Sequence, residues 1–253
     1  MGVATGPGSI AFASGSGAVA HVFSTDLDES VVIEGEDGHH LQRVRRLRAG
    51  ESVTVSDGRG HWRAYAVERS NHGSLVLAAA DAPRTEPRLA PGLSVAFALS
   101  KGTKPEHVVA GLTELGVDRI VPFRSARSVV RWEGERARSA TARLRRVARE
   151  AAMQCRRSWL PEVLDPVDLD GLATDGVVVV GDPSGPAAQA LAFPAGGEWL
   201  AVVGAEGGLA PDERFRLAER LGTTLVAVGP HVLRAETAAL ALAAVLTVRR
   251  SVI

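Results

Sequence analysis

The chain is poor in the residues that hold small secreted domains and many metal centres together. Its 253 residues include one cysteine, Cys155, which excludes an internal disulfide framework and a cysteine-rich metal site and is typical of a reducing cytosol. We interpret Cys155 as a buried small residue. No apolar stretch is long enough to span a membrane, and residues 1–20 lack the basic start of a signal peptide. The sequence therefore predicts a cytoplasmic protein with a disordered leader over residues 1–20, without a metal or a membrane contact.

Lysine is also scarce, and its distribution limits the kinds of nucleotide site that are possible. No lysine follows Lys104, so the chain has no phosphate loop of the form GxxxxGK(S/T). Its glycine spacing does not match the dinucleotide fingerprint GxGxxG either. The sequence therefore argues against an NTPase and against a Rossmann dehydrogenase.

What the chain does have is a set of short apolar runs that end in glycine-marked loops. Residues 177–180, 199–203 and 224–228 are rich in β-branched side chains, which is typical of buried parallel strands. Open α/β sheets bind ligands at the edge where such strands end, and glycine lets the backbone approach a ligand closely. Taken alone, neither loop is specific, and an isolated Gly-Gly pair such as Gly207-Gly208 is more often a simple strand-to-helix turn.

The order of these pieces is more specific than any one of them. Gly-x-Glu-Gly-Gly at residues 204–208 is followed by a helix, a strand and Gly-Pro-x-x-Leu-Arg-x-Glu-Thr-Ala at residues 229–238. This order resembles the C-terminal signature of the SPOUT methyltransferases and, more narrowly, the RsmE family. The resemblance runs from about residue 22 to residue 250, with further matches at residues 99–101, 114–117 and 120–122, and at Ser128, Gln154, Cys155 and Arg157.

The resemblance implies both a fold and a reaction. It implies an α/β protein in which a small PUA-like β-barrel, an RNA-binding domain, precedes a C-terminal SPOUT domain with a trefoil knot near residues 203–239. The implied reaction uses S-adenosylmethionine to methylate N3 of a uridine in small-subunit (16S) ribosomal RNA, giving 3-methyluridine. The implied assembly is a homodimer in which both chains complete each active site.

Four positions depart from the pattern of the family. Ala205 stands where proline is usual and Ala235 where threonine is usual, and both are small replacements that preserve the loops. Met153 stands where glutamate is common and Arg156 where a small residue is common. The last two alter a segment implied to contact RNA and leave the methyl-donor pocket unchanged.

The domain organisation follows from strand alternation and from proline. Residues 52–56, 62–68 and 74–79 alternate like the strands of a small antiparallel barrel, so we expect the PUA-like domain at residues 21–81. Residues 82–92 hold three prolines and no apolar period, which predicts a linker. Strands at 93–99 and 119–123 alternate with helices at 104–116 and 135–157, so we expect the SPOUT domain at residues 93–253.

The formal net charge is zero, but the positive charge is concentrated in one part of the chain. Residues 86–165 hold 15 Lys and Arg against 9 Asp and Glu, and residues 124–157 hold 11 arginines against 3 acids. Guanidinium groups suit contacts with phosphates and base edges, although a charged run is also compatible with a solvated helix face. A second basic cluster lies in a predicted helix around residues 39–48, where we interpret His39 and His40 as helix-start residues and not as metal ligands. The predicted RNA contacts, some carried over from the resemblance, are Arg43, Arg45, Arg46, Lys101, Arg127, Arg145, Arg146 and Arg157.

The reaction asks for particular residue types around the two loops. We expect Arg234 to stabilise the uracil anion or to orient the RNA, because a fixed cation lowers the free energy of developing negative charge. Glu206 and Glu236 are candidates for accepting the N3 proton, and each is equally suited to capping a helix or holding Arg234. The predicted methyl-donor residues are Gly181, Gly204, Ala205, Glu206, Gly207, Gly208, Leu209, Val228, Gly229, Pro230, Val232 and Leu233.

Residue chemistry without the resemblance supports only an α/β protein with a basic face and a glycine-lined pocket. Two other functions therefore stay open. One is a different SPOUT methylation, such as transfer to a ribose 2'-oxygen, and the other is a non-catalytic RNA-binding or ribosome-assembly factor that keeps the fold. Trp62 and Tyr65 are further candidates for stacking on bases, although aromatic side chains in a strand more often belong to a core.

Overall fold

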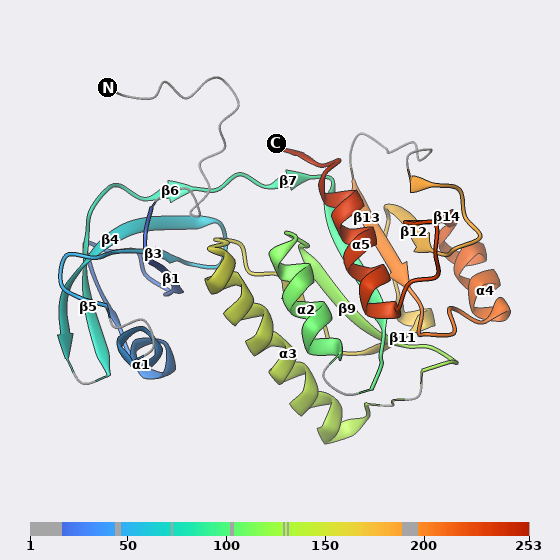
Figure 1. Cartoon of the computed structure of the whole chain (residues 1–253), viewed down its shortest axis with the longest axis horizontal. Coiled ribbons are helices and arrows are strands. Elements are labelled where there is room, and N and C mark those ends of the chain that lie inside the picture. Colours follow the sequence, from blue (N-terminus) through green and yellow to red (C-terminus); the bar gives the residue numbers. More distant parts are fainter. Residues whose placement is uncertain are drawn as a thin grey trace. The chain divides into compact units, whose positions relative to one another are not determined.

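The computed structural model describes residues 17–43, 47–71, 73–101, 104–128, 130, 132–188 and 197–252. Their backbone contacts form two compact units, one of residues up to Arg88 with Ala152–Leu160, and one of Leu89–Ala151 with the chain from Pro161 onward. Figure 1 shows the elements in chain order. They are β1 (Ala20–Phe23), β2 (Ser30–Ile33), α1 (Gly35–Arg43), β3 (Ser52–Ser56), β4 (His61–Asn71), β5 (Ser74–Ala79), β6 (Arg84–Thr85), β7 (Leu89–Ala90), β8 (Gly92–Ala98), α2 (Lys104–Glu114), β9 (Arg119–Arg124), α3 (Gly134–Cys155), β10 (Glu162–Val163), β11 (Val167–Asp168), the 3-10 helix η2 (Leu169–Gly171), β12 (Val177–Gly181), β13 (Glu198–Val203), α4 (Pro211–Leu221), β14 (Thr224–Val226), α5 (Ala235–Thr247) and β15 (Ser251–Val252).

The first unit is built on a sheet with the strand order β1-β3-β4-β5-β2, and β6 also pairs with β4. The neighbouring strands run antiparallel, as predicted, except that β1 pairs with β3 in parallel. Period-2 alternation turns side chains such as Val53, Val55, Leu75 and Leu77 into one core. Trp62 and Tyr65 each retain at most 1% of their accessible surface. They therefore belong to the core and do not stack on bases.

The helix predicted around residues 39–48 begins earlier than expected. Helix α1 starts at Gly35, whose φ of 68° suits glycine, and it carries Glu36 and Asp37 in its first turn. The interpretation of His39 as a helix-start residue is therefore wrong. The described part of the helix ends at Arg43, and the predicted RNA contacts Arg45 and Arg46 lie outside the described residues, as does the side chain of Arg43.

The end of α3 returns to the first unit and is held there by polar contacts. The indole of Trp159 donates a hydrogen bond to the Glu86 carbonyl at 3.0 Å, and Ser158 donates to the Glu86 carboxylate. The Arg88 guanidinium lies 3.8 Å from the centre of the Trp159 ring, which is a favourable cation–π geometry. Of the residues predicted as a linker, 84–85 form β6 and 89–90 form β7, which pairs with β15.

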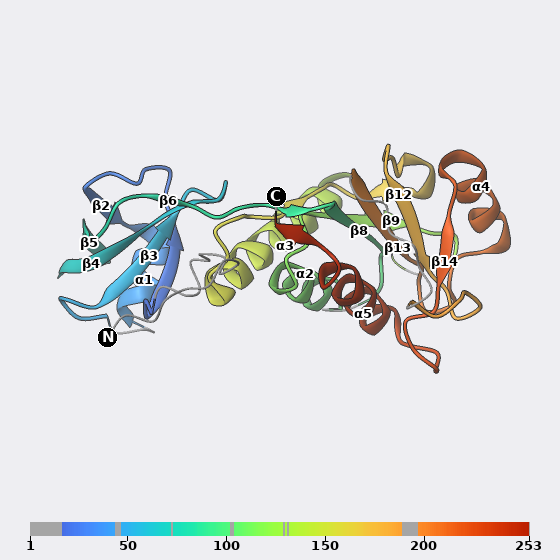
Figure 2. The same cartoon turned by 90° about the horizontal axis from the view of Figure 1, so that it is seen from above.

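The second unit is a three-layer arrangement around a sheet with the order β10-β9-β8-β13-β12-β14, and β11 also pairs with β9. All the pairings within this sheet are parallel. On β13, Trp199, Ala201 and Val203 belong to the core that includes α2, α3 and α5, whereas Leu200 and Val202 face the core that includes α4. Figure 2 shows α2 and α5 on one side of the sheet and α4 on the other.

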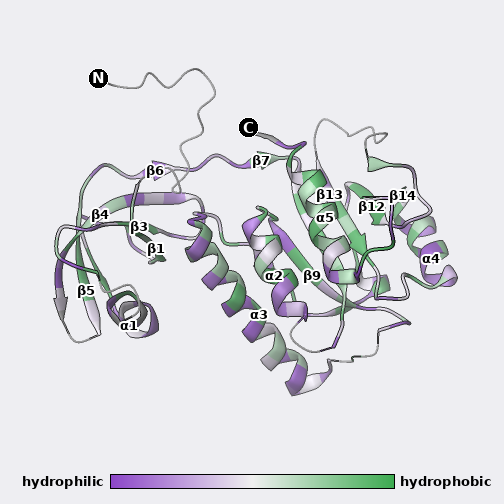
Figure 3. Ribbon diagram, viewed as in Figure 1, coloured by the Kyte–Doolittle hydropathy of each residue, from purple (hydrophilic) through white to green (hydrophobic). Residues whose placement is uncertain are grey.

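Local sequence features explain the ends of α4 and the hydrophobic character of α5. Pro211 opens α4, Glu213 accepts hydrogen bonds from the backbone of Ala210 at 2.8 Å and of Ala126 at 2.7 Å, and Gly222 ends the helix with a φ of 63°. Alanine and leucine dominate α5, which is coloured as hydrophobic over most of its length, whereas α3 alternates between hydrophobic and hydrophilic (Figure 3). None of the helices in the described part of the chain is long and apolar enough to cross a membrane. The knot implied near residues 203–239 stays a prediction.

A polar network ties three neighbouring strands of this sheet at one end. Glu198 of β13 accepts hydrogen bonds from Ser94 of β8 and from the guanidinium of Arg119 of β9. Partial burial raises the pKa of Glu198, but the hydrogen bonds from Arg119 and Ser94 outweigh this and hold the pKa below its usual range. The ionised form of Glu198 is therefore the form that stabilises the fold.

We predict that Glu198→Gln lowers the free energy of unfolding by about 1–3 kcal/mol near neutral pH, because a hydrogen bond to a charged group is lost. Since the pKa of Glu198 is lowered by folding, its contribution is complete above the unfolded-state pKa and disappears as the pH falls through the folded-state pKa. Urea unfolding of both proteins across this acidic range measures the difference. The exposed Glu219→Gln serves as the control, and a difference that stays constant with pH contradicts the prediction.

Candidate active site

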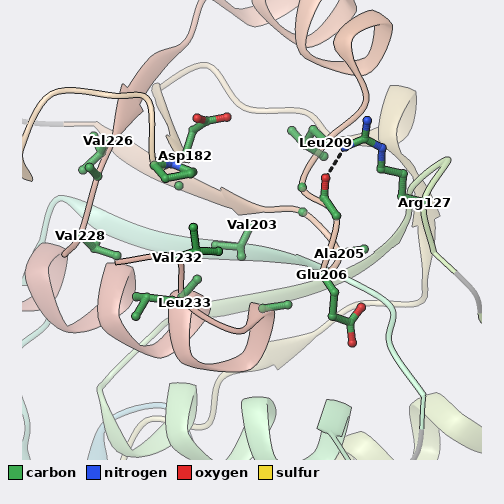
Figure 4. A pocket seen from close by; sticks show the side chains of 18 of the residues that line it. Arg127, Asp182, Val203, Ala205, Glu206, Leu209, Val226, Val228, Val232 and Leu233 are labelled. Carbon is green, nitrogen blue, oxygen red and sulfur yellow. Dashed lines mark hydrogen bonds between the residues drawn. The ribbon is translucent and has the colours of Figure 1, made fainter. Parts of the chain in front are cut away.

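A cavity of about 330 Å³ lies where β12, β13 and β14 end. Three segments line most of it, namely residues 181–183 after β12, residues 204–209 after β13, here called the first loop, and residues 228–233 after β14, here called the second loop. Ala235 and Ala238 of α5 add to the lining. Figure 4 shows side chains from these segments converging around the cavity. The position is the one at which open α/β sheets bind ligands.

Most of the predicted methyl-donor residues meet at this cavity. Pro230 is not among its lining residues and the other eleven are, although they lie up to 52 positions apart in the sequence. Those eleven are Gly181, Gly204, Ala205, Glu206, Gly207, Gly208, Leu209, Val228, Gly229, Val232 and Leu233.

The first loop requires glycine at two positions. Gly208 has a φ of 71°, and its backbone N–H donates to the Ala205 carbonyl at 2.7 Å, which closes a tight turn. A Cβ atom on Gly204 would lie 2.7 Å from the carbonyl carbon of Gly208, closer than two such atoms approach. Ala205, where the family usually has proline, is buried inside the turn. The expectation that alanine preserves the shape of this loop stays a prediction.

Arg127, predicted as an RNA contact, is one of the lining residues of the cavity. Its guanidinium donates a hydrogen bond to the Gly207 carbonyl. The Glu206 carboxylate points away from Arg127 (Figure 4). The side chain is exposed, so it is also available to a polyanion. Its predicted contact with RNA stays a prediction.

Two charged residues of the cavity wall are absent from the predicted set. The carboxylate of Asp182 accepts hydrogen bonds from Ser184 at 2.6 Å and from Arg214 of α4 at 2.9 Å, and both Asp182 and Arg214 line the cavity. Partial burial raises the pKa of Asp182, but the hydrogen bonds from Ser184 and Arg214 outweigh it and hold the pKa below its usual range. The place of Asp182 directly after a strand is a signal that sequence reasoning could have used, whereas nothing local indicates Arg214.

The two candidate bases share one cation. The Nζ atom of Lys104 lies 2.8 Å from Oε1 of Glu206 and 3.7 Å from Oε2 of Glu236. The hydrogen bond from Lys104 lowers the pKa of Glu206, which makes its carboxylate a weaker proton acceptor. Glu206 lines the cavity and Glu236 does not.

Arg234 lies at the end of the second loop and caps α5. Its carbonyl accepts a hydrogen bond from the Ala238 N–H at 2.8 Å, and its side chain is exposed. It is not among the lining residues of the cavity. The structure thus places Arg234 beside the pocket, with its guanidinium accessible from solvent.

The arginines of α3 differ in what they contact. Arg145 donates to the Val163 carbonyl at 3.0 Å and to the Asp165 carboxylate at 3.3 Å, so part of its hydrogen-bonding capacity is used within the unit. Arg146 next to it is exposed, as is Lys101, whereas Arg157 is half-buried. No group of three or more His, Cys, Asp or Glu side chains is placed to hold a metal among the described residues.

Comparison with known proteins identifies relatives that span both units. Residues 88–247 match a family described as an RNA methyltransferase domain, and residues 33–78 match an RNA methyltransferase PUA domain. The ribosomal RNA small subunit methyltransferase E of Mycobacterium bovis is 34% identical over 223 residues, covering 85% of this chain and 84% of the relative. The enzyme of the same name from Bacillus subtilis is 32% identical over 223 residues, covering 82% and 86%.

Solved structures agree with the sequence comparison. The ribosomal RNA small subunit methyltransferase E of Neisseria gonorrhoeae, solved with S-adenosylmethionine bound, superposes with a TM-score of 0.80 at 25% identity, covering 91% of this chain and 97% of that one. The predicted fold, a PUA-like domain followed by an α/β methyltransferase domain, is confirmed. The chain belongs to the ribosomal RNA small subunit methyltransferase E (RsmE) family, and it is an RNA methyltransferase.

Proposed function

We propose that the protein uses S-adenosylmethionine to methylate N3 of a uridine in small-subunit (16S) ribosomal RNA in the cytoplasm, giving 3-methyluridine. The observation that carries the proposal is the cavity formed by the first and second loops at the ends of β12, β13 and β14. The relatives that match this chain are named for methylating ribosomal RNA of the small subunit, and a structural neighbour holds S-adenosylmethionine.

The residues around the cavity suit such a donor. Val203, Leu209, Val226 and Leu233 supply apolar surface for a purine base, and the glycines leave backbone groups open for hydrogen bonds. The ionised carboxylate of Asp182 is able to accept hydrogen bonds from hydroxyl or ammonium groups. A Cβ atom on Gly229 would meet nothing within 4 Å, so the backbone there borders open space.

Methylation at N3 requires two things of the side chains of this protein: a group that accepts the N3 proton and a group that stabilises the resulting negative charge. S-adenosylmethionine supplies an electrophilic methyl group, while N3 of uracil must lose a proton and spread negative charge over O2 and O4. Arg234 stands beside the pocket with an exposed guanidinium, and a preorganised cation there lowers the free energy of that charge. We assign Arg234 to charge stabilisation for this reason.

The proton acceptor is one of the two glutamates that contact Lys104. Glu206 lines the cavity but has a lowered pKa, whereas Glu236 lies behind the cavity lining in the first turn of α5. Position favours Glu206, because a general base must come within hydrogen-bonding distance of the proton it removes. Glu236 then serves mainly to hold the surrounding charges in place.

We also propose that the enzyme works as a homodimer. Val232 of the second loop and Val248 after α5 are each 81% exposed, which is the highest value among the large apolar side chains of the described residues. Val232 lines the cavity, and Val248 directly follows the last residue of α5. A second chain covering them would complete the site.

The direct test uses purified 30S subunits that lack the modification, labelled S-adenosylmethionine and nucleoside analysis of the product. We expect 3-methyluridine. A 2'-O-methylated nucleoside would contradict transfer to N3 and favour the ribose alternative. Failure to bind S-adenosylmethionine at all would favour a non-catalytic RNA-binding or assembly factor.

We predict that Arg234→Ala lowers kcat about 100-fold or more and leaves the Kd for S-adenosylmethionine within about twofold, because charge stabilisation acts in the transition state. Single-turnover methylation and calorimetric titration measure the two quantities. Arg220→Ala is the control, since Arg220 of α4 pairs with Asp170 and does not line the cavity. Equal losses in both quantities would contradict the assigned role.

We predict that Arg146→Ala weakens RNA binding and makes the slope of log Kd against log salt shallower by about one, because one phosphate contact is lost. Arg145→Ala is the matched neighbour, and we expect a smaller change because Arg145 already contacts Val163 and Asp165. Filter binding at several salt concentrations measures both slopes. Unchanged slopes for both variants would show that this face of α3 is solvated and does not contact RNA.

A further inference from the structure

Lys104 is one of only two lysines in the chain, and it lies between the first loop of the donor pocket and the start of α5. It is the first residue of α2, 102 positions before Glu206. Its ammonium group contacts the carboxylate of Glu206 in the first loop and that of Glu236 in the first turn of α5, directly after the second loop. A single cation thus bridges the first loop and the start of α5, both of which contribute lining residues to one pocket.

The charges around Lys104 explain why such a bridge is needed. Both glutamate oxygens lie within 3.7 Å of the same nitrogen, so the two carboxylates are close neighbours. Without the ammonium group the two carboxylates would repel each other, which favours separation of the first loop from the start of α5. Oε2 of Glu236 is shielded from solvent and accepts no hydrogen bond within the described part of the chain, so the nearby positive charge offsets part of its lost hydration.

We propose that Lys104 is a positioning residue for methyl transfer, which joins the first loop to the start of α5 through Glu206 and Glu236 and so holds the donor pocket at its working width. The proposal rests on the proposed function. Lys104 is not among the lining residues of the cavity, whereas Glu206 is. Lys104 therefore acts on the donor through the first loop and the start of α5, and not by touching it.

The bridge is partly exposed, which sets the size of the expected effect. The side chains of Lys104 and Glu206 retain 38% and 50% of their accessible surface. Exposed ion pairs contribute modestly, so we expect Lys104→Met to raise the Kd for S-adenosylmethionine about three- to tenfold. Lys104→Arg keeps the positive charge and should stay within about twofold of the unchanged protein.

The experiment is a double-mutant cycle on the full chain with S-adenosylmethionine as the ligand. Its members are the unchanged protein, Lys104→Met, Glu206→Gln and the double variant, each titrated by calorimetry. If the bridge acts as proposed, the two single losses are not additive, and the double variant binds no worse than the weaker single variant. Additive losses, or a Lys104→Met variant that binds as tightly as the unchanged protein, would overturn the proposal.

Arg143→Met provides the matched control for a general loss of stability. Arg143 of α3 pairs with Glu106, which lies in the first turn of α2 as Lys104 does, and neither Arg143 nor Glu106 is among the lining residues of the cavity. Its removal should leave the Kd for S-adenosylmethionine unchanged, and thermal unfolding of each variant shows whether the fold is intact. Absence of donor binding by the unchanged protein would instead overturn the proposed function, and the role of Lys104 with it.

Discussion

Parallel pairing of β12 with β13 and with β14 is the constraint on which the site depends. Because parallel strands end at the same edge, the segments after them meet even though they are far apart along the chain. The first loop follows β13, the second follows β14, and Asp182 follows β12. The pocket walls are therefore consequences of strand register, and the first loop depends on the positive φ of Gly208 and on the space left by the missing Cβ of Gly204.

The same sheet also fixes the helices that support these loops. Alternate residues of β13 face opposite sides, so one face packs against α2 and α5 and the other against α4. Helix α4 carries Arg214 to the Asp182 side of the pocket, and α2 carries Lys104 to the side of Glu206. Charged residues from both layers thus contact segments that line one cavity. In this arrangement Asp182 is paired with Arg214 and Glu206 with Lys104, and these partners help to hold the pKa of each carboxyl below its usual range.

Local sequence patterns predicted most of the helices and strands well. They failed where contacts between residues distant in the sequence decide the structure. The β-branched run at residues 177–180 was sufficient to predict β12, and alternation predicted β3 and β5 to the residue. The start of α1 was misplaced because its first residues, Gly35 to Gly38, have no apolar period to mark them. The sequence left base stacking open for Trp62 and Tyr65 beside the more usual place in a core, because their burial depends on strands that pair across the unit.

By itself the sequence determined the chemistry of the two loops, their order and the family, because glycine, arginine and glutamate at fixed spacing leave a local signature. Only the tertiary structure decided which charged side chains serve the site. Lys104 meets Glu206 across 102 residues, Arg127 meets Gly207 across 80 and Arg214 meets Asp182 across 32. Periodicity describes neighbours within a turn or a strand, whereas these contacts arise when sheet packing brings separate layers together.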